Sequence, residues 1–214
     1  MKKEKIILKS THPDEYPDLE VECRVIENNE IASYLETIPQ ERKIVGYKTG
    51  EVLARIGIVG EEIHTILKTI VDGKEYILKE EKATVKERLY TDQVTTAVDI
   101  VIRNISSTSD EEYVVKREKF DKTYEITSCN DSAIEKNGYS YIRCIPAYDP
   151  RVITQIDENL IIMTSWGEPA ICLAGSYIVT YNADENDYNT IEQNAFKSTY
   201  SIEYSKTKVL RNKQ

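Results

Sequence analysis

The chain contains one pattern of residues twice, and this self-similarity limits the folds that it can adopt. The order Phe-x-x-Thr-Tyr-x-Ile begins at Phe120 and again at Phe196, which are the only two phenylalanines in the sequence. The four matches from Phe120 to Ile126 recur at a constant offset of 76 residues, and the similarity extends upstream over the segments 113–126 and 188–202. A fixed period of this kind predicts that one supersecondary unit is built twice.

Each copy of the pattern is preceded by an apolar stretch and a polar turn. Residues 98–102 lead into the turn 106–110, and residues 177–179 lead into the turn 183–187. We therefore expect a strand, a turn, a second strand, one short helical turn that carries the phenylalanine, and a closing strand. The phenylalanine is predicted to plug the open end of a small curled sheet, because a sheet of few strands cannot otherwise bury its ends.

Alternating apolar and polar residues favour strands in most of the chain. Residues 19–25 alternate strictly, which is typical of a half-buried strand. A short helix is expected over Ile31–Thr37, and Asp72-Gly73 predicts a type I′ hairpin turn. Residues 79–89 fit either a helix or a strand. The other predicted strands are 63–71, 75–78, 94–104, 139–145, 160–165 and 177–182.

These patterns predict a mainly β (α+β) fold with two related small curled-sheet or barrel-like modules after an N-terminal α/β segment. The 15 tyrosines agree with this fold, because tyrosine suits a pleated sheet with one wet face. The predicted boundaries are 1–43 for the N-terminal strand-helix segment, 44–130 for the first module, 137–204 for the second module and 205–214 for a basic tail.

Composition excludes several classes of protein. The formal net charge of −9 gives the chain no general attraction to nucleic acid or to anionic membranes. Eight glycines and 6 prolines are too few for a collagen-like or low-complexity chain. Neither a signal peptide nor a membrane helix is expected, because the sequence has no apolar run of the necessary length. The expected location is therefore the cytoplasm.

The cysteines do not predict a metal or redox site. Cys23, Cys129, Cys144 and Cys172 lie far apart, whereas zinc sites and redox dithiols usually need close pairs. All except Cys129 lie in apolar stretches, so we expect them to be buried free thiols. No metal and no cofactor is assigned.

The closing unit resembles small, largely uncharacterised phage and bacterial domains that carry a Pro-Gly-Asp-Tyr strand and end in Phe-x-x-Thr-Tyr. Ala174-Gly175-Ser176-Tyr177 occupies the place of Pro-Gly-Asp-Tyr, so the proline and the aspartate are replaced. Thr164-Ser165-Trp166-Gly167 resembles the hairpin before it, and 60–65 resembles the opening hairpin of the other copy. The similarity covers roughly residues 58–126 and 151–204. It implies a small β-fold and a phage or mobile-element origin, and it implies no activity.

Aromatic residues near the turns of the second copy are the first candidate site. These residues are Trp166, Tyr177, Tyr181 and Tyr188. As an exposed patch they would contact a partner protein, since aromatic side chains are enriched at the centres of interfaces. The alternative is that the rings cap the core of the module.

Arginines and histidines give two further hypotheses. Arg103 and Arg143 could hold a small anionic ligand such as a signalling nucleotide. A hydrolase or nucleotide-modifying enzyme would use His64 with a carboxylate such as Glu62. The chain has only 2 histidines and no recognisable catalytic motif, so no catalytic residue is assigned.

The sequence therefore predicts a non-catalytic binding protein, linked to phage or mobile elements, that recognises a protein partner through tyrosine-rich β surfaces. Sequestration of a small anionic ligand is the alternative, and an enzyme that uses His64 is a further one. The sequence does not predict the oligomeric state, and a homodimer is compatible with it.

Overall fold

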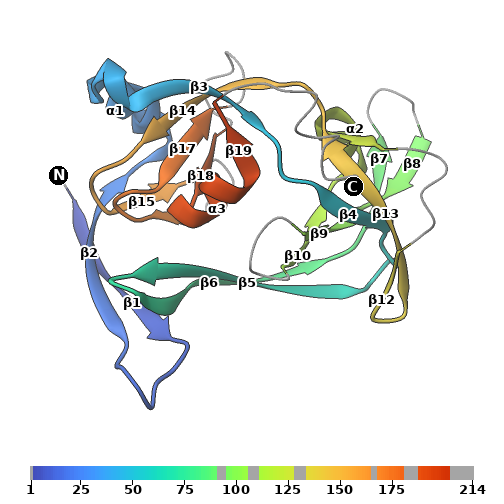
Figure 1. Ribbon diagram of the computed structural model, residues 1–214, viewed down its shortest axis with the longest axis horizontal. Coiled ribbons are helices and arrows are strands. Elements are labelled where there is room, and N and C mark those ends of the chain that lie inside the picture. Colours follow the sequence, from blue (N-terminus) through green and yellow to red (C-terminus); the bar gives the residue numbers. More distant parts are fainter. Residues whose placement is uncertain are drawn as a thin grey trace. The chain divides into compact units, whose positions relative to one another are not determined.

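The computed structural model describes residues 2–90, 95–105, 111–127, 134–164, 168–180 and 188–202 (Figure 1). Most of these residues lie in strands, so the predicted mainly β fold class is confirmed. The helices are short, and in the described part of the chain none is long and apolar enough to cross a membrane.

In chain order the elements are β1 (Lys3–Ser10), β2 (Leu19–Ile26), a 3-10 turn (Asn28–Glu30), α1 (Ile31–Thr37), a second 3-10 turn (Gln40–Arg42), β3 (Lys43–Lys48), β4 (Val52–Ile56), β5 (Glu62–Val71), β6 (Lys74–Thr84), β7 (Glu87–Tyr90), β8 (Thr95–Val98), β9 (Ile100–Asn104), β10 (Glu112–Val115), α2 (Arg117–Thr123), β11 (Tyr124–Ile126), β12 (Ile134–Lys136), β13 (Tyr139–Pro146), β14 (Pro150–Gln155), β15 (Leu160–Met163), β16 (Pro169–Cys172), β17 (Tyr177–Thr180), β18 (Tyr188–Ile191), α3 (Gln193–Thr199) and β19 (Tyr200–Ser201).

The chain divides into two compact units, and each is made of separate segments of the sequence. Unit 1 comprises Met1–Tyr47, Leu67–Lys79 and Pro150–Glu203. Unit 2 comprises the rest, so that β5 and β6 run from one unit into the other.

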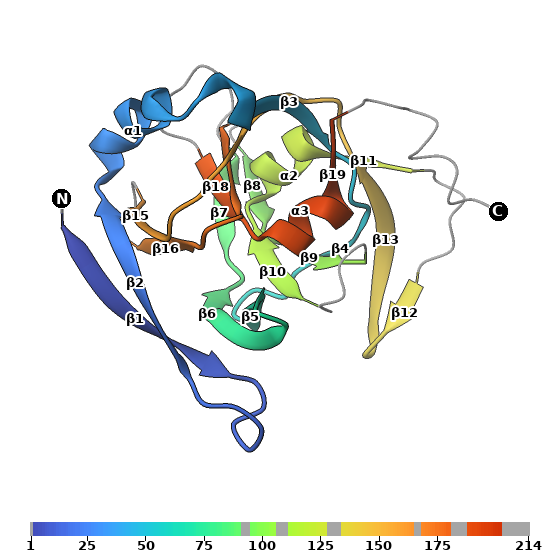
Figure 2. The same ribbon diagram turned by 60° about the vertical axis from the view of Figure 1, so that its left-hand side comes forward.

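One sheet of unit 1 is built on a long hairpin of β1 and β2, which Figure 2 shows side by side. The sheet order is β16-β15-β2-β1-β6-β5. Val21, Cys23 and Val25 alternate with exposed residues along β2 and are buried, as the sequence pattern predicts. Helix α1 packs beside this sheet, with Ile31 and Tyr34 in the core. Asp72 and Gly73 both have positive φ, which fits the predicted type I′ turn.

The remaining two large sheets, one in each unit, are built in the same order. In unit 1 the order is β18-β17-β14-β3-β19, and in unit 2 it is β10-β9-β4-β13-β11, with β12 beside β13. A seven-residue helix precedes the closing strand in each case, α3 before β19 and α2 before β11. Positions in the two sheets can therefore be matched strand by strand, whereas duplication of the sequence itself remains a prediction.

The two phenylalanines have matching surroundings. Phe120 of α2 is buried and its ring centroid lies 5.5 Å from that of Tyr124. Phe196 of α3 is buried and lies 5.5 Å from Tyr200 in the same way. Each ring packs against the central strands of its own sheet, with Ala54 on β4 or Ile153 on β14 in the contact cluster.

Each of these sheets includes a strand that is continuous in sequence with the other sheet. β3 and β4 follow one another along the chain, but β3 pairs with β14 in unit 1 and β4 pairs with β13 in unit 2. β13 and β14 also follow one another along the chain, and β13 belongs to the unit 2 sheet while β14 belongs to the unit 1 sheet. The chain therefore passes from one unit to the other between β3 and β4 and again between β13 and β14. The sequence pattern does not reveal this topology, because periodicity identifies strands and not their partners.

Cys23, Cys144 and Cys172 are buried free thiols. Burial raises the pKa of Cys144 to about 11 and that of Cys172 to about 12, so neither is a ready nucleophile at neutral pH. Cys129 lies outside the described residues.

Candidate functional site

The two described members of the predicted aromatic site, Tyr177 and Tyr188, lie in different clusters. Trp166 and Tyr181 lie outside the described residues. The ring of Tyr177 stacks on Phe196 at 3.9 Å between centroids, inside the cluster under α3. Tyr188 is buried in a different cluster with α1, and its hydroxyl donates to the backbone oxygen of Asn28 at 3.2 Å. Of the four residues, the two that are described thus contribute to core packing.

The two predicted arginines do lie together. Arg103 on β9 and Arg143 on β13 are each directly opposite Leu53 of β4, so the three side chains share one row on one face of the unit 2 sheet. Arg143 pairs with Glu51 at 3.1 Å, and Arg103 pairs with Glu112 at 3.5 Å. An anionic ligand would have to compete with these two carboxylates.

A third arginine of the same face, Arg55, was not found from the sequence. It is buried, and its guanidinium donates to both carboxylate oxygens of Glu61 at 2.9 and 2.6 Å. It also donates to the hydroxyl of Tyr141 at 3.3 Å and lies 3.8 Å from the ring centroid of Tyr139. A buried charge is costly unless it is paired and hydrogen-bonded, and Arg55 meets both conditions.

The Arg55–Glu61 pair braces a tight turn between β4 and β5. A carboxylate oxygen of Glu61 accepts from the backbone N–H of Ile58 at 3.2 Å, and the Glu61 N–H donates to the Ile58 carbonyl at 2.8 Å. Gly60, at φ +88°, donates to the Val85 carbonyl at 3.0 Å. These bonds fix both the backbone of the turn and the side chain beneath it, so the turn is expected to be rigid.

This turn displays aliphatic side chains. Ile56 is 64% exposed, and Ile58 and Val59 are each 59% exposed. We call residues 56–60 the aliphatic turn. Three large aliphatic side chains are thus exposed within four residues of one turn, and apolar side chains gathered on a surface are typical of a binding site.

The matching turn of unit 1 is polar. The first residue after β4 is Gly57, whose N–H donates to the Asp99 carbonyl at 3.0 Å. The first residue after β14 is Ile156, whose N–H donates in the same way to the Ser176 carbonyl at 2.9 Å, so Gly57 and Ile156 occupy matching positions. The positions that match Ile58 and Val59 are therefore Asp157 and Glu158. The fold does not require aliphatic residues at this turn.

The acids of the unit 1 turn are bound to the chain itself. Asp157 pairs with Arg42 at 2.5 Å, and Glu158 pairs with Arg24 at 3.2 Å. Glu158 also accepts from the hydroxyl of Tyr34 at 3.1 Å. A pocket of about 270 Å³ lies beside them, and the charged residues in its lining already have partners.

The titration of the Arg55 network follows from its contacts. The Arg55 hydrogen bonds hold the pKa of Glu61 below its ordinary value, although burial opposes this shift. The hydrogen bond with Glu61 raises the pKa of Tyr139. Burial, followed by the hydrogen bond to Glu112, raises the pKa of Tyr141. At neutral pH the network therefore holds a charged Glu61 and neutral tyrosines.

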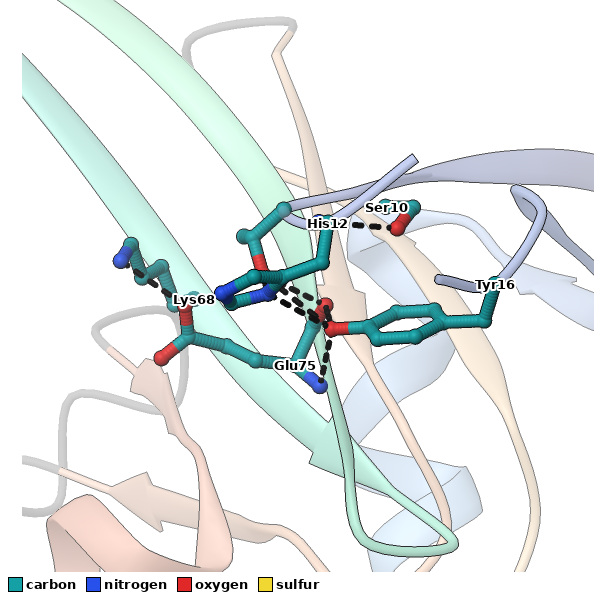
Figure 3. Close-up of polar contacts among 6 residues, drawn as sticks. Ser10, His12, Tyr16, Lys68 and Glu75 are labelled. Atoms are coloured by element: carbon teal, nitrogen blue, oxygen red, sulfur yellow. Dashed lines mark hydrogen bonds and ion pairs between the residues drawn. The ribbon is translucent and has the colours of Figure 1, made fainter. Parts of the chain in front are cut away.

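A second polar cluster lies in unit 1, where the loop between β1 and β2 meets β6 (Figure 3). The hydroxyl of Tyr16 donates to the Glu75 carbonyl at 2.9 Å and accepts from the Glu75 N–H at 3.1 Å. Thr11 donates to the same carbonyl at 3.0 Å, and Nδ1 of His12 lies 3.1 Å from the Tyr16 hydroxyl. The Glu75 carboxylate is directed to Lys68 instead, at 2.8 Å.

This cluster fastens a loop. Its hydroxyl groups are directed to the backbone of Glu75, so they satisfy peptide groups.

His64, the other histidine, is exposed on β5 with its Nε2 3.6 Å from Glu80, while Glu62 pairs with Lys82 at 3.2 Å. His64 and Glu62 thus each have a different partner.

Among the described residues, no group of three or more His, Cys, Asp or Glu side chains could hold a metal ion. No protein-family model matches the chain, and no curated protein or solved structure matches it significantly. The site with the most distinctive geometry is therefore the aliphatic turn with the Arg55 network beneath it. Its sequence signal is the run Ile56-Gly57-Ile58-Val59-Gly60, an apolar segment punctuated by glycines.

Proposed function

We propose that this chain is a non-catalytic binding protein and that the aliphatic turn of unit 2 enters an apolar pocket of a partner protein. The observation that carries the proposal is the exposure of Ile56, Ile58 and Val59 on a braced turn whose counterpart in unit 1 is polar. Exposed aliphatic side chains lower solubility, so their presence at one turn and not at the other points to use in binding.

Rigidity supports the same function. A turn that is already fixed loses little conformational entropy when a partner binds it, which leaves more of the apolar contact energy for affinity. The Arg55–Glu61 pair supplies this rigidity, and Tyr139 lies against the pair with its ring on Arg55. One tyrosine of strand β13 thus packs on the ion pair that braces the turn.

The anionic-ligand alternative has weaker support. Arg55, Arg103 and Arg143 lie on one face, but each is paired with a carboxylate, from Glu61, Glu112 and Glu51 respectively. Binding of a nucleotide would leave those acids without counter-charges, at a cost comparable to the gain.

The proposal is tested by site-specific photocrosslinking in cells that normally contain the protein. A photoreactive residue at Val59 is compared with one at Glu158, the matching position of unit 1. We expect one protein to crosslink from Val59 and not from Glu158. Equal crosslinking from both positions would contradict the proposal.

The crosslinked protein is then purified and its affinity is measured by calorimetry. The triple variant Ile56→Gln, Ile58→Asp, Val59→Glu replaces each side chain by its unit 1 counterpart. We expect the Kd to rise at least about ten-fold, with an unchanged melting temperature. An unchanged Kd would rule out the turn as the contact.

A further inference from the structure

A second apolar patch lies on the five-stranded sheet of unit 1. Val45 on β3 and Val152 on β14 are directly opposite one another, and they are 55% and 46% exposed. The next pair on the same face is Tyr47 and Pro150. Single exposed aliphatic residues are ordinary, but two that touch across the central strands of a sheet form a continuous patch. We call Val45 and Val152 with their neighbours the open face.

The same position in unit 2 is closed. Leu53 corresponds to Val152 and lies between Arg103 and Arg143, and it is only 4% exposed. In unit 1 the flanking residues are Thr180 and Val45, whose side chains are much shorter. Long arginine stems can cover a neighbouring aliphatic side chain, whereas threonine and valine cannot.

The two units are therefore specialised in opposite ways. Unit 2 has the aliphatic turn and a closed face, while unit 1 has the open face and an acidic turn. An exposed aliphatic turn on one unit and an exposed apolar sheet face on the other can bury one another between two copies of the chain.

Charges next to the two surfaces agree with this pairing. Lys43 lies on the same face as Val45, two residues earlier, and makes no ion pair with any residue in the described part of the chain. Glu62 is exposed three residues after Val59, where it pairs with the exposed Lys82 at 3.2 Å. An exposed ion pair contributes little stability, so Glu62 can exchange this partner for another cation. A second copy would bring an exposed acid close to this lysine.

We infer that the chain associates with itself head to tail, the aliphatic turn of one copy packing on the open face of the next. This inference rests on the proposed binding role of the turn and names one partner for it. The contact is heterologous, because different surfaces meet, so it generates rings or open chains and not a simple symmetric pair. The net charge of −9 opposes association, so the contact strengthens with added salt.

The test uses two variants that borrow residues between units. Val45→Arg gives the open face the arginine that unit 2 has at the matching position, Arg143. Ile58→Asp gives the turn the aspartate that unit 1 has at the matching position, Asp157. Sedimentation velocity is measured from micromolar concentrations upward. We expect concentration-dependent assembly of the unmodified protein, and at least about ten-fold weaker association for each variant.

Mixing the two variants decides the geometry. The Val45→Arg chain keeps its turn and the Ile58→Asp chain keeps its open face, so an equimolar mixture should form a dimer with one intact contact and nothing larger. Ile7→Gln, which changes an exposed isoleucine elsewhere in unit 1, should leave assembly unchanged.

A monomeric unmodified protein at all concentrations would overturn the inference, as would assembly that neither variant weakens or that mixing does not restore. If the protein is monomeric while the triple variant still loses its crosslinked partner, self-association falls and the proposed binding function stands. If the protein is monomeric and the triple variant also binds its crosslinked partner as tightly as the unmodified protein does, the proposed binding function falls as well.

Discussion

Glu61 shows how one side chain can serve both the interior and the surface. Its carboxylate neutralises buried Arg55 and also accepts the Ile58 N–H, so the charge of a hidden pair fixes the shape of an exposed turn. Sequence alone gave no reason to choose Glu61 over its neighbour Glu62. The difference arises from the position of Arg55 on β4, which is a property of the fold.

Glu61→Gln is predicted to destabilise the protein most at neutral pH. The variant leaves Arg55 buried without its counter-charge, which typically costs about 3–5 kcal/mol. Because the native pKa of Glu61 lies below the ordinary value of about 4.5, its stabilisation is complete above that pH and is lost as pH falls through the native pKa. The difference in the free energy of unfolding between wild type and variant should therefore become smaller at acid pH.

Urea unfolding at a series of pH values measures this gap. Glu62→Gln is the control, because Glu62 is exposed and pairs with exposed Lys82. It should change stability by less than about 1 kcal/mol. A gap for Glu61→Gln that is constant from neutral to acid pH would contradict the assigned role.

The short helices are the elements at which sequence and structure agree best. Phe120 and Phe196 are each the buried residue of a seven-residue helix, and each ring is stacked on the tyrosine that starts the closing strand. Helices this short are not stable alone, so their packed ring holds them in place. The ring, more than helix propensity, should decide whether each sheet end is closed.

Phe120→Ala and Phe196→Ala are each predicted to lower the free energy of unfolding by about 3–5 kcal/mol, as the loss of a buried ring does. Chemical denaturation followed by circular dichroism measures the loss. Phe→Leu at each position should recover much of it, because most of the apolar volume returns. Losses below about 1 kcal/mol at both positions would show that the rings are not structural plugs.

Local elements were predictable where a local signal exists. Asp72-Gly73 defined its hairpin turn, and α1 occupies the expected residues Ile31–Thr37. Residues 79–89 were ambiguous because lysine, glutamate and alanine favour a helix. They extend in β6 and β7, because Tyr76 and Val85 anchor the segment in cores that the local sequence cannot specify.

At the scale of the whole molecule, the pairing of β3 inside the unit 1 sheet should keep the chain together after cleavage. β3 lies between β14 and β19, so a cut in the link between β3 and β4 leaves β3 held by the unit 1 sheet. A protease site inserted at residues 49–51 is predicted to give two fragments that elute together under native conditions. They should separate only in denaturant.

Gel filtration of the cleaved protein measures this, with denaturing electrophoresis to confirm complete cleavage. A matched site at residues 147–149, between β13 and β14, should behave alike. Fragments that separate without denaturant would show that the strand pairings of the unit 1 sheet do not hold the fragments together.

Partners of the central strands could not be predicted, and this also explains the partial prediction of the candidate site. Arg103 and Arg143 were selected from the sequence, but Arg55 joins them only because β4 lies between β9 and β13. The aromatic candidates were chosen because they lie near turns of the second copy. In the structure Tyr177 and Tyr188 pack into two different clusters.

The long sequence separation between β3 and β14 also affects how the chain folds during its synthesis. β3 leaves the ribosome roughly 100 residues before β14, its neighbour in the sheet, and at ordinary translation rates that delay is about 5–20 s. During this interval a strand with valine and isoleucine side chains has no native edge to join, and contacts of such long sequence separation form slowly. Nascent chains should therefore depend on protection from chaperones until the second half has been made.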